Sequence, residues 1–239
     1  MDTIKINSGN AKMVAHRGVS GLELENTCAA FVAAGNRSYY GVETDVHVTS
    51  DGQFIIIHDD NTGRVAVESM VVEETTYEIL RALQLKQKDG RMRTDLRLPS
   101  LEEYLSICKH YDKVCVLELK NPMPEAAVKG IIEVCAKVYC LEKMVFISFD
   151  FQNMLYIRKY APDAEAQYLL AEEITQAHIE QLAENNLDLD VHYLAMSEDL
   201  MKRLHERGIK VNCWTVDDPE IAERLVSWGI DYITSNILE

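Results

Sequence analysis

A predicted hairpin between residues 43 and 59 holds the side chains of this chain that are best placed to do chemistry. Glu43 and Asp45 lie two residues apart in a β-branched run, and because a strand alternates its faces, both carboxylates point to one side. A Ser-Asp-Gly sequence predicts a tight turn, and the returning run ends at His58, which the hairpin places opposite Thr44 and so between the acids. An acidic pair beside an imidazole favours metal-assisted acid–base chemistry. The alternative is a surface hairpin with solvated acids.

The composition narrows the classes of partner. The chain has 239 residues, of which 47% are hydrophobic, enough for a single α/β barrel or for two small domains. Its net charge is −15, from 39 acids against 24 lysines and arginines. Such a field repels nucleic acid and anionic membranes at long range, so no nucleic-acid partner is expected. An anionic small-molecule substrate must therefore be attracted locally, by a metal or by a few placed cations.

Cysteine usage and the apolar runs predict a reduced, cytoplasmic protein. None of the six cysteines forms a Cys-x-x-Cys pair, and all fall in predicted helices or strands, as small core residues do. The first ten residues hold no apolar signal core. No stretch approaches the ~20 apolar residues of a membrane span, so no stable membrane insertion is expected. A homodimer is compatible with the sequence.

Strand-like runs alternate with amphipathic helical segments along the chain, which predicts a parallel sheet. The third predicted strand follows the second too closely for a helical crossover, so it must return antiparallel. The remaining eight can be parallel, and the sequence therefore predicts a (β/α)8 TIM barrel. An open doubly wound sheet is the alternative, weakened by the lack of a Gly-x-Gly-x-x-Gly after the first strand. The nine predicted strands are Met13–His16, Val42–His47, Gln53–His58, Val114–Lys120, Met144–Phe149, Ala166–Leu170, Leu189–Tyr193, Val211–Val216 and Tyr232–Ser235.

Residues 60–98 contain no predicted core strand. They hold one short amphipathic segment, around residues 76–85, followed by polar residues. We expect a small insertion after the third strand, over the active-site end of the barrel, within a single domain that spans residues 1–239. Ser100 and Glu103 form a capping-box pattern that predicts the start of the next helix.

The carboxyl ends of the predicted strands carry a set of polar residues. Active sites of such barrels lie at these ends. Each residue has an ordinary alternative, such as an ion pair or, for the tryptophan, a core aromatic. Their joint placement favours function, because buried charges are costly unless they are paired or used. The set consists of His16, Arg17, Glu43, Asp45, His58, Glu118, Lys120 and Trp214.

The residue types in this set indicate the reaction class. Three carboxylates without a cysteine suit a hard divalent cation, Mg²⁺ or Ca²⁺, better than Zn²⁺. Arg17 offers a bidentate fork for phosphate oxygens and Lys120 a point charge. Two imidazoles beside a bound anion favour general acid–base catalysis. A cation, phosphate clamps and an acid–base pair together favour cleavage of a phosphoryl ester.

Nine short motifs extend this set along the chain. In order they are His16-Arg17-Gly18, Glu25-Asn26-Thr27, Glu43-Thr44-Asp45-Val46, Thr49-Ser50-Asp51-Gly52, His58-Asp59, Leu98-Pro99-Ser100-Leu101-Glu102-Glu103, Glu118-Leu119-Lys120, Ser148-Phe149 and Trp214-Thr215-Val216. Taken together, they resemble the glycerophosphodiester phosphodiesterases over nearly the whole chain. The resemblance implies a TIM barrel with a small insertion and a metal-dependent hydrolysis of glycerophosphodiesters to glycerol 3-phosphate and an alcohol.

The resemblance also implies roles for individual residues. The implied roles are metal binding by Glu43, Asp45 and Glu118, acid–base catalysis by His16 and His58, phosphate binding by Arg17 and Lys120, and substrate binding by Glu25 and Trp214. Asn26 either shapes the same mouth or caps the helix that follows it. One departure is the last strand, which ends in Thr-Ser-Asn-Ile where many members have Thr-Asp-x-Pro, so no family role passes to Ser235.

Two other functions stay open at this point. One is a lysophospholipase D-like activity on single-chain lipids, which needs an apolar landing surface; the apolar residues 65–67 and 70–72 of the insertion could supply it. The other is a non-catalytic phosphodiester-binding module. The presence of all seven polar residues argues against it, since a degenerate barrel is expected to lose at least one of them.

Overall fold

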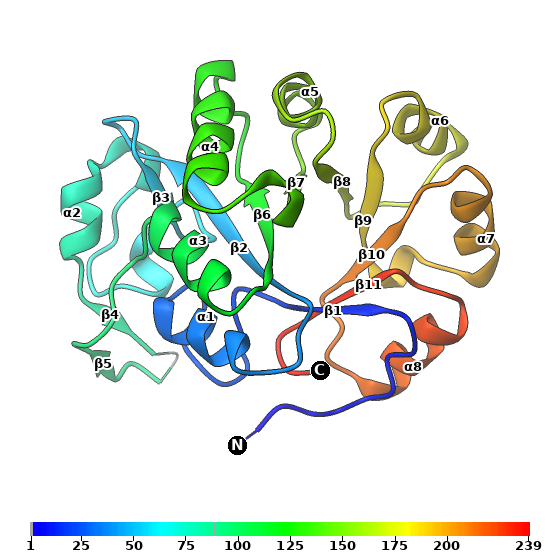
Figure 1. Cartoon of the computed structure of the whole chain (residues 1–239). Helices are drawn as coiled ribbons and strands as arrows, with labels where there is room; N and C mark the ends of the chain where they lie inside the picture. The colour runs from blue at the N-terminus through cyan, green and yellow to red at the C-terminus, as the bar shows by residue number, and fades with distance from the viewer. Residues whose placement is uncertain (1, 88) are drawn as a thin grey trace.

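Eight parallel strands form the centre of the molecule. The structure is a computed structural model that describes residues 2–87 and 89–239. β1 pairs in parallel with both β2 and β11, which closes the sheet into a barrel, and Figure 1 shows the helices around it. The predicted TIM barrel is confirmed. The barrel strands are β1 (Lys12–Ala15), β2 (Gly41–Val48), β6 (Val114–Leu119), β7 (Met144–Ser148), β8 (Glu165–Leu170), β9 (Asp188–His192), β10 (Val211–Trp214) and β11 (Tyr232–Ser235).

Helices follow the barrel strands and cover their outer face. The expected capping box is present, because the Ser100 hydroxyl accepts from the Glu103 N–H and the Glu103 carboxylate accepts from the Ser100 N–H. Apolar side chains fill the layer between helices and strands. The covering helices are α1 (Cys28–Gly35), α3 (Leu101–His110), α4 (Glu125–Val138), α5 (Phe151–Tyr160), α6 (Gln176–Glu184), α7 (Glu198–Glu206) and α8 (Pro219–Ser227). Among the described residues, no helix is both long and apolar enough to cross a membrane.

The hairpin forms as the sequence predicts. β3 (Phe54–Ile56) pairs antiparallel with β2, with Val46 opposite Ile56. The same register, carried two residues further, brings His58 opposite Thr44. The Ile57 N–H donates to the Asp45 carbonyl, which extends the pairing toward that point. The hairpin is therefore an antiparallel extension of an otherwise parallel barrel, and it delivers His58 to the strand that carries the acids.

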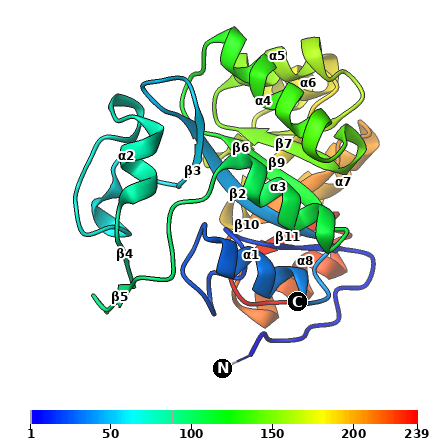
Figure 2. The ribbon, with the colours of Figure 1, turned by 60° about the vertical axis from the view of Figure 1, so that its left-hand side comes forward.

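The segment after β3 folds into a small unit of its own. It contains the 3-10 turns η1 (Thr62–Arg64) and η2 (Val72–Glu74), the helix α2 (Tyr77–Ala82), and the two short strands β4 (Leu85–Lys86) and β5 (Met92–Arg93). The helix lies where the amphipathic segment predicts it. The two-residue strands show no periodicity that could predict them. Apolar residues of this unit form a separate cluster with Ile55 and Ile57, and Figure 2 shows the unit beside β3 at one side of the barrel.

The barrel interior has an apolar and a polar part. Valines from β1, β6 and β7 pack there with Ile147, Leu169 and Tyr232. Strands β8 to β11 also place buried polar side chains inside, namely Gln167, Asp190, Asn212 and Thr234. Asn212 donates to Gln167 and accepts from Thr234, which satisfies three of these four residues in part. Asp190 and Thr234 extend to the cavity described next.

Candidate active site

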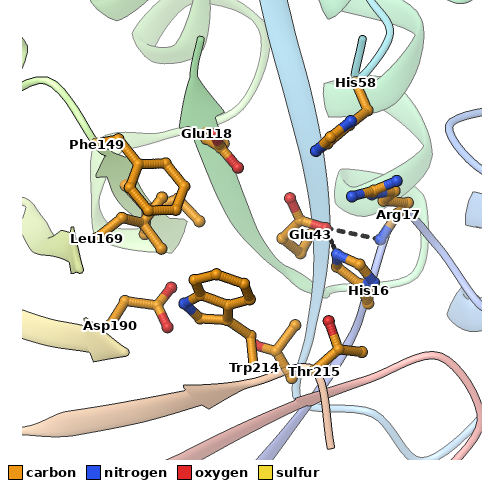
Figure 3. A pocket seen from close by; sticks show the side chains of 12 residues that line it. His16, Arg17, Glu43, His58, Glu118, Phe149, Leu169, Asp190, Trp214 and Thr215 are labelled. Carbon is orange, nitrogen blue, oxygen red and sulfur yellow. Dashed lines mark hydrogen bonds and ion pairs between the residues drawn. The ribbon is translucent and has the colours of Figure 1, made fainter. Parts of the chain in front are cut away.

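A cavity opens at the carboxyl ends of the barrel strands, where such barrels hold their active sites. Six of the residues predicted from the sequence line it, and Figure 3 shows their side chains turned toward one another. Asp45, Lys120 and Glu25 lie directly behind them, in contact with the lining residues. The full lining is His16, Arg17, Glu43, His58, Glu118, Ile147, Phe149, Leu169, Asp190, Trp214, Thr215 and Thr234.

Three buried carboxylates meet on β2 and β6. Ligand oxygens of Glu43, Asp45 and Glu118 lie within 4.8 Å of one another. The parallel register explains this, because it pairs Asp45 with Glu118 directly. Burial, and then the neighbouring carboxylates, raise the pKa of Glu43 well above its usual range. Burial also opposes the ionisation of Asp45, but Lys120 and Arg17 hold the pKa of Asp45 far below its usual range.

This cluster fits a hard divalent cation. Among the described residues, the buried Oδ1 atom of Asp45 accepts no hydrogen bond. The Lys120 ammonium lies 3.7 Å from this oxygen, too far for a hydrogen bond. A buried acceptor without a hydrogen bond is costly, and a bound cation would satisfy it. The donor set is all oxygen, as Mg²⁺ and Ca²⁺ require. Glu43, Asp45 and Glu118 are therefore the residues that could hold such an ion.

Two cations lie against the carboxylates. The Arg17 backbone N–H donates to Glu43 at 2.7 Å, and its guanidinium donates to Glu25 at 2.8 Å. The Lys120 ammonium donates to Glu118 at 2.7 Å. Arg17 adopts a left-handed backbone conformation (φ 52°), and Gly18 follows it at φ 75°. A Cβ atom at Gly18 would lie 2.6 Å from that of Ala30, so this turn can approach α1 only with glycine there.

The hydrogen-bond partners around His16 decide which of its ring nitrogens carries the proton. Its Nδ1 atom lies 2.8 Å from Oδ1, the side-chain oxygen of Asn236. That oxygen also accepts from Ser20, while the Asn236 amide donates to Asp217 at 2.6 Å, so the orientation of Asn236 is set by its partners. Nδ1 must therefore donate, which leaves a lone pair on Nε2, 4.0 Å from Glu43. Burial, and then Arg17, lower the pKa of His16 to about 4, which keeps the ring neutral.

His58 is held by a chain of ion pairs. Its Nδ1 atom lies 2.6 Å from Asp59, whose carboxylate accepts from Arg64 at 2.6 and 3.0 Å. Arg64 belongs to the insertion and also donates to Glu25. Since Glu25 binds Arg17, one continuous chain of charges joins His58 to the guanidinium in the cavity. The sequence offered no sign of Arg64, because an exposed arginine in a loop has no pattern that singles it out.

Asn26 does not cap the following helix, so that alternative is wrong. Thr27 caps α1 with its hydroxyl. The side-chain nitrogen of Asn26 instead donates to Asp45 at 2.7 Å, and its side-chain oxygen accepts from the Thr44 hydroxyl at 2.7 Å. The left-handed backbone of Asn26 (φ 53°) turns the side chain inward. Asn26 therefore orients one carboxylate of the cluster.

Trp214 lies in the cavity wall. Its ring packs edge-on against Phe149, at 5.7 Å between centroids, and against His192, at 5.2 Å. Its indole nitrogen is buried and has no hydrogen-bond partner in the described part of the chain. The interpretation of Trp214 as a core aromatic is therefore incomplete, since a purely structural tryptophan usually pairs its N–H when it is buried.

Fold and site together define a TIM-barrel enzyme with a cavity equipped for cleaving phosphoric esters. The model of the glycerophosphoryl diester phosphodiesterase family matches residues 16–238. The chain belongs to this family, and it is a phosphoric diester hydrolase by class.

Individual relatives are similar to this chain over nearly their whole length. The glycerophosphodiester phosphodiesterase of Caldanaerobacter subterraneus subsp. tengcongensis is 29% identical over 231 residues, covering 94% of this chain and 93% of that protein. An Oleispira antarctica phosphodiesterase, solved with the product sn-glycerol-3-phosphate, superposes with a TM-score of 0.85 at 25% identity, covering 98% and 96% of the two chains. A glycerophosphodiester phosphodiesterase from Parabacteroides distasonis has a TM-score of 0.79 at 27% identity, covering 95% and 93%. The family predicted from the motifs is confirmed.

Proposed function

We propose that this enzyme hydrolyses glycerophosphodiesters to sn-glycerol 3-phosphate and an alcohol, with His16 and His58 as its acid–base pair. The observation that carries the proposal is the pairing of each histidine, through Nδ1, with a fixed acceptor beside the carboxylate cluster. Each ring is thereby oriented, as general acid–base catalysis requires. The Oleispira antarctica phosphodiesterase, of the same fold, carries sn-glycerol-3-phosphate as its product, which supports the substrate class.

The proposed cofactor is one divalent cation, Mg²⁺ or Ca²⁺, held by Glu43, Asp45 and Glu118. When bound there, such an ion supplies positive charge that draws the phosphate in and stabilises the charge that develops on its oxygens. On the same side of the cavity, the Arg17 guanidinium adds a pair of parallel hydrogen-bond donors and the Lys120 ammonium adds a compact positive charge. Together these groups offset the long-range repulsion between an anionic substrate and a chain of net charge −15.

The proposed proton transfers use the two rings in different roles. His16 presents the lone pair of Nε2 to the cavity and removes a proton from the attacking hydroxyl. His58, held by Asp59 and Arg64, protonates the oxygen of the departing alcohol. The attacker is either water or the neighbouring hydroxyl of the substrate's own glycerol, which would form a cyclic phosphate first. Proximity favours the second route, and detection of a cyclic phosphate early in single turnovers distinguishes the two.

A panel of glycerol diesters of choline, ethanolamine, inositol and glycerol tests the function. We expect glycerol 3-phosphate to be released from at least one of them, EDTA to abolish the release, and added Mg²⁺ or Ca²⁺ to restore it. Release that survives thorough chelation would remove the metal role from the proposal. No release from any diester by the metal-loaded enzyme would contradict the function itself.

Lysophospholipids remain the second candidate substrate. Phe149 and Leu194 follow barrel strands and are 45% and 73% exposed, which favours some apolar contact near the mouth. The insertion contributes less than the sequence predicts, because Val65, Ala66 and Val72 are buried in its own core. Comparing rates on glycerophosphocholine and lysophosphatidylcholine separates the two activities, and we expect the former to be faster.

We also propose that residues 1–239 act as one domain. The ion pairs of Arg64 with Asp59 and Glu25 join the insertion to the catalytic end of the barrel. A cytoplasmic location stays a prediction from the sequence.

A further inference from the structure

Two buried polar atoms of the cavity are left without partners by the chemistry described so far. Within residues 2–87 and 89–239, neither Oδ1 of Asp190 nor Nε1 of Trp214 makes a hydrogen bond. Asp190 is only 2% exposed, and both residues line the cavity. An unpaired buried donor and an unpaired buried acceptor are each costly. Such groups in a cavity wall are therefore candidates for contact with a ligand.

The two atoms lie away from the phosphate-binding groups. Asp190 is on β9, which is four strands from β2 in either direction around the closed barrel. It therefore stands across the barrel from Glu43. Figure 3 shows Asp190 and the nitrogen edge of Trp214 facing each other, with His16, Arg17 and Glu43 on the opposite side of the cavity. A ligand whose phosphate is bound by Arg17 would extend its other end toward Asp190.

Asp190 and Trp214 together match a hydroxyl group. The indole N–H only donates, and a carboxyl oxygen accepts. An alcohol can accept from the first and donate to the second at the same time. Phe149 and Leu169 complete this wall with apolar surface that suits the carbon atoms of a small polyol. Among the described residues, no lysine or arginine lines this side of the cavity, so a phosphate group would find no such partner here.

The charge state of Asp190 argues against a cationic head group as the occupant. Burial, and then Glu118, raise the pKa of Asp190 well above its usual range, against the opposing effect of the Asn212 amide. The raised pKa favours the protonated carboxyl, which attracts an ammonium group less than a carboxylate does and can both accept from and donate to hydroxyls.

We propose that Asp190 and Trp214 form a subsite for the terminal hydroxyl of the substrate's glycerol moiety, the hydroxyl farthest from the phosphate. The subsite explains how the enzyme would distinguish a glycerol phosphodiester from other phosphodiesters. It rests on the proposed function, because it places the glycerol moiety of that substrate in this cavity. Asp190 is thereby a specificity residue that touches the substrate and takes no part in proton transfer.

The test compares two ligands that differ in one hydroxyl. Glycerol 3-phosphate and 2-hydroxypropyl phosphate share the phosphate and the middle hydroxyl, but the second lacks the terminal one. Their affinities are measured by calorimetry with Mg²⁺ present. We expect the wild-type enzyme to prefer glycerol 3-phosphate by about tenfold or more, because losing the hydroxyl leaves two buried groups unpaired. No preference in the wild type would overturn the proposal.

Variants assign the preference to these residues. Asp190→Ala should bring the ratio of the two affinities close to one while leaving 2-hydroxypropyl phosphate binding unchanged. Asp190→Asn, which keeps a donor and an acceptor, should retain most of the preference. Asp163→Asn, an exposed aspartate before β8, is the matched control and should change neither affinity. A purely structural role would lower the melting temperature of Asp190→Ala and leave the ratio unchanged.

Trp214→Phe provides an independent measurement should Asp190→Ala fold poorly. It keeps an aromatic ring and removes the N–H, so we expect it to reduce the preference several-fold. If the wild type prefers glycerol 3-phosphate and Trp214→Phe retains the full preference, the subsite is wrong while the proposed function stands. If the wild type neither binds glycerol 3-phosphate nor cleaves any glycerol diester, the proposed function fails as well.

Discussion

The two sides of the cavity surround their buried acids with different neighbours. The charged wall, formed by Arg17, Glu43, Asp45, Glu118 and Lys120, surrounds each carboxylate with cations and other acids. The apolar wall, formed by Phe149, Leu169, Asp190 and Trp214, holds one carboxyl without an ion-pair partner among the described residues.

Asp45 and Asp190 are almost equally buried, at 0% and 2% exposure, yet the pKa of Asp45 is lowered and that of Asp190 is raised. Burial therefore does not decide the charge of an acid here; its neighbours do. Lys120 and Arg17 stabilise the anion of Asp45, which suits metal binding. Asp190 has no such cation beside it in the described part of the chain, and it suits contact with a neutral hydroxyl.

Removing one acid of the charged wall should have the largest effect. Asp45→Asn keeps the shape but removes a charge from the carboxylate cluster, so we expect kcat to fall ~10³-fold, in line with the several kcal/mol that a catalytic cation supplies. Calorimetric titration with Mg²⁺ should show weakened binding in the same variant. Asp163→Asn should behave as the wild type. Full turnover by Asp45→Asn would show that the cluster is not the metal site.

The charged wall was the more predictable of the two walls. Alternation along β2 and β6 predicts that Glu43 and Asp45 share a face, and that Glu118 and Lys120 share another, because each pair lies two residues apart. The parallel fold then brings those faces together. Local pattern and fold class therefore suffice to predict this cluster.

Other contacts of the site depend on tertiary geometry alone. Asn236 meets His16 across 220 positions of sequence, and Arg64 reaches Asp59 from an irregular turn. Asp190 is one of two acids in β9, two residues after Asp188, and that spacing alone does not show which of them faces a cavity. Sequence patterns describe periodic elements well, but they do not describe pairs of residues that the closing of the barrel brings together.

The two histidines should follow the metal ligands in size of effect. His16→Ala and His58→Ala should each lower kcat on glycerophosphocholine by ~10²-fold or more, because each removes a proton-transfer group. A diester with a p-nitrophenolate leaving group needs no protonation, so it should restore much of the rate of His58→Ala and little of that of His16→Ala. The reverse pattern would exchange the two roles.

His110→Ala is the control for both histidine variants. His110 is exposed at the end of α3, away from the cavity lining. Its removal should leave kcat unchanged. A comparable loss of kcat in His110→Ala would show that the losses in the two histidine variants come from general destabilisation.

A smaller effect is expected from the insertion. Arg64→Met removes the partner that holds Asp59 against His58, and we expect kcat to fall about fivefold, since a partly exposed ion pair is worth ~1 kcal/mol. Arg81→Met is the matched control, because Arg81 lies in the same insertion and pairs with Glu103, outside the cavity lining. It should lower the melting temperature without a matching loss of kcat. Equal kcat losses in both variants would contradict a positioning role for Arg64.

The smallest expected effect is a shift between two pH profiles. Burial lowers the pKa of His58 in the free enzyme, and Arg17 and Lys120 add to this against the opposing charges of Asp45 and Asp59. As the general acid, His58 must be protonated, so kcat/KM should fall as the pH rises through this lowered pKa. A bound phosphate anion counters Arg17 and Lys120, which raises the pKa of His58 in the complex. The alkaline limb of kcat should therefore lie at higher pH than that of kcat/KM.

The acid limb of the kcat/KM profile depends on the ionisation of the other histidine, His16. His16 must be neutral to accept a proton, and its pKa of about 4 places the loss of kcat/KM from this group well below neutral pH. Circular dichroism across the range separates these limbs from unfolding. Coincident alkaline limbs for kcat and kcat/KM would mean that bound phosphate does not change the effect of Arg17 and Lys120 on the pKa of His58. The phosphate would then not bind at the charged wall.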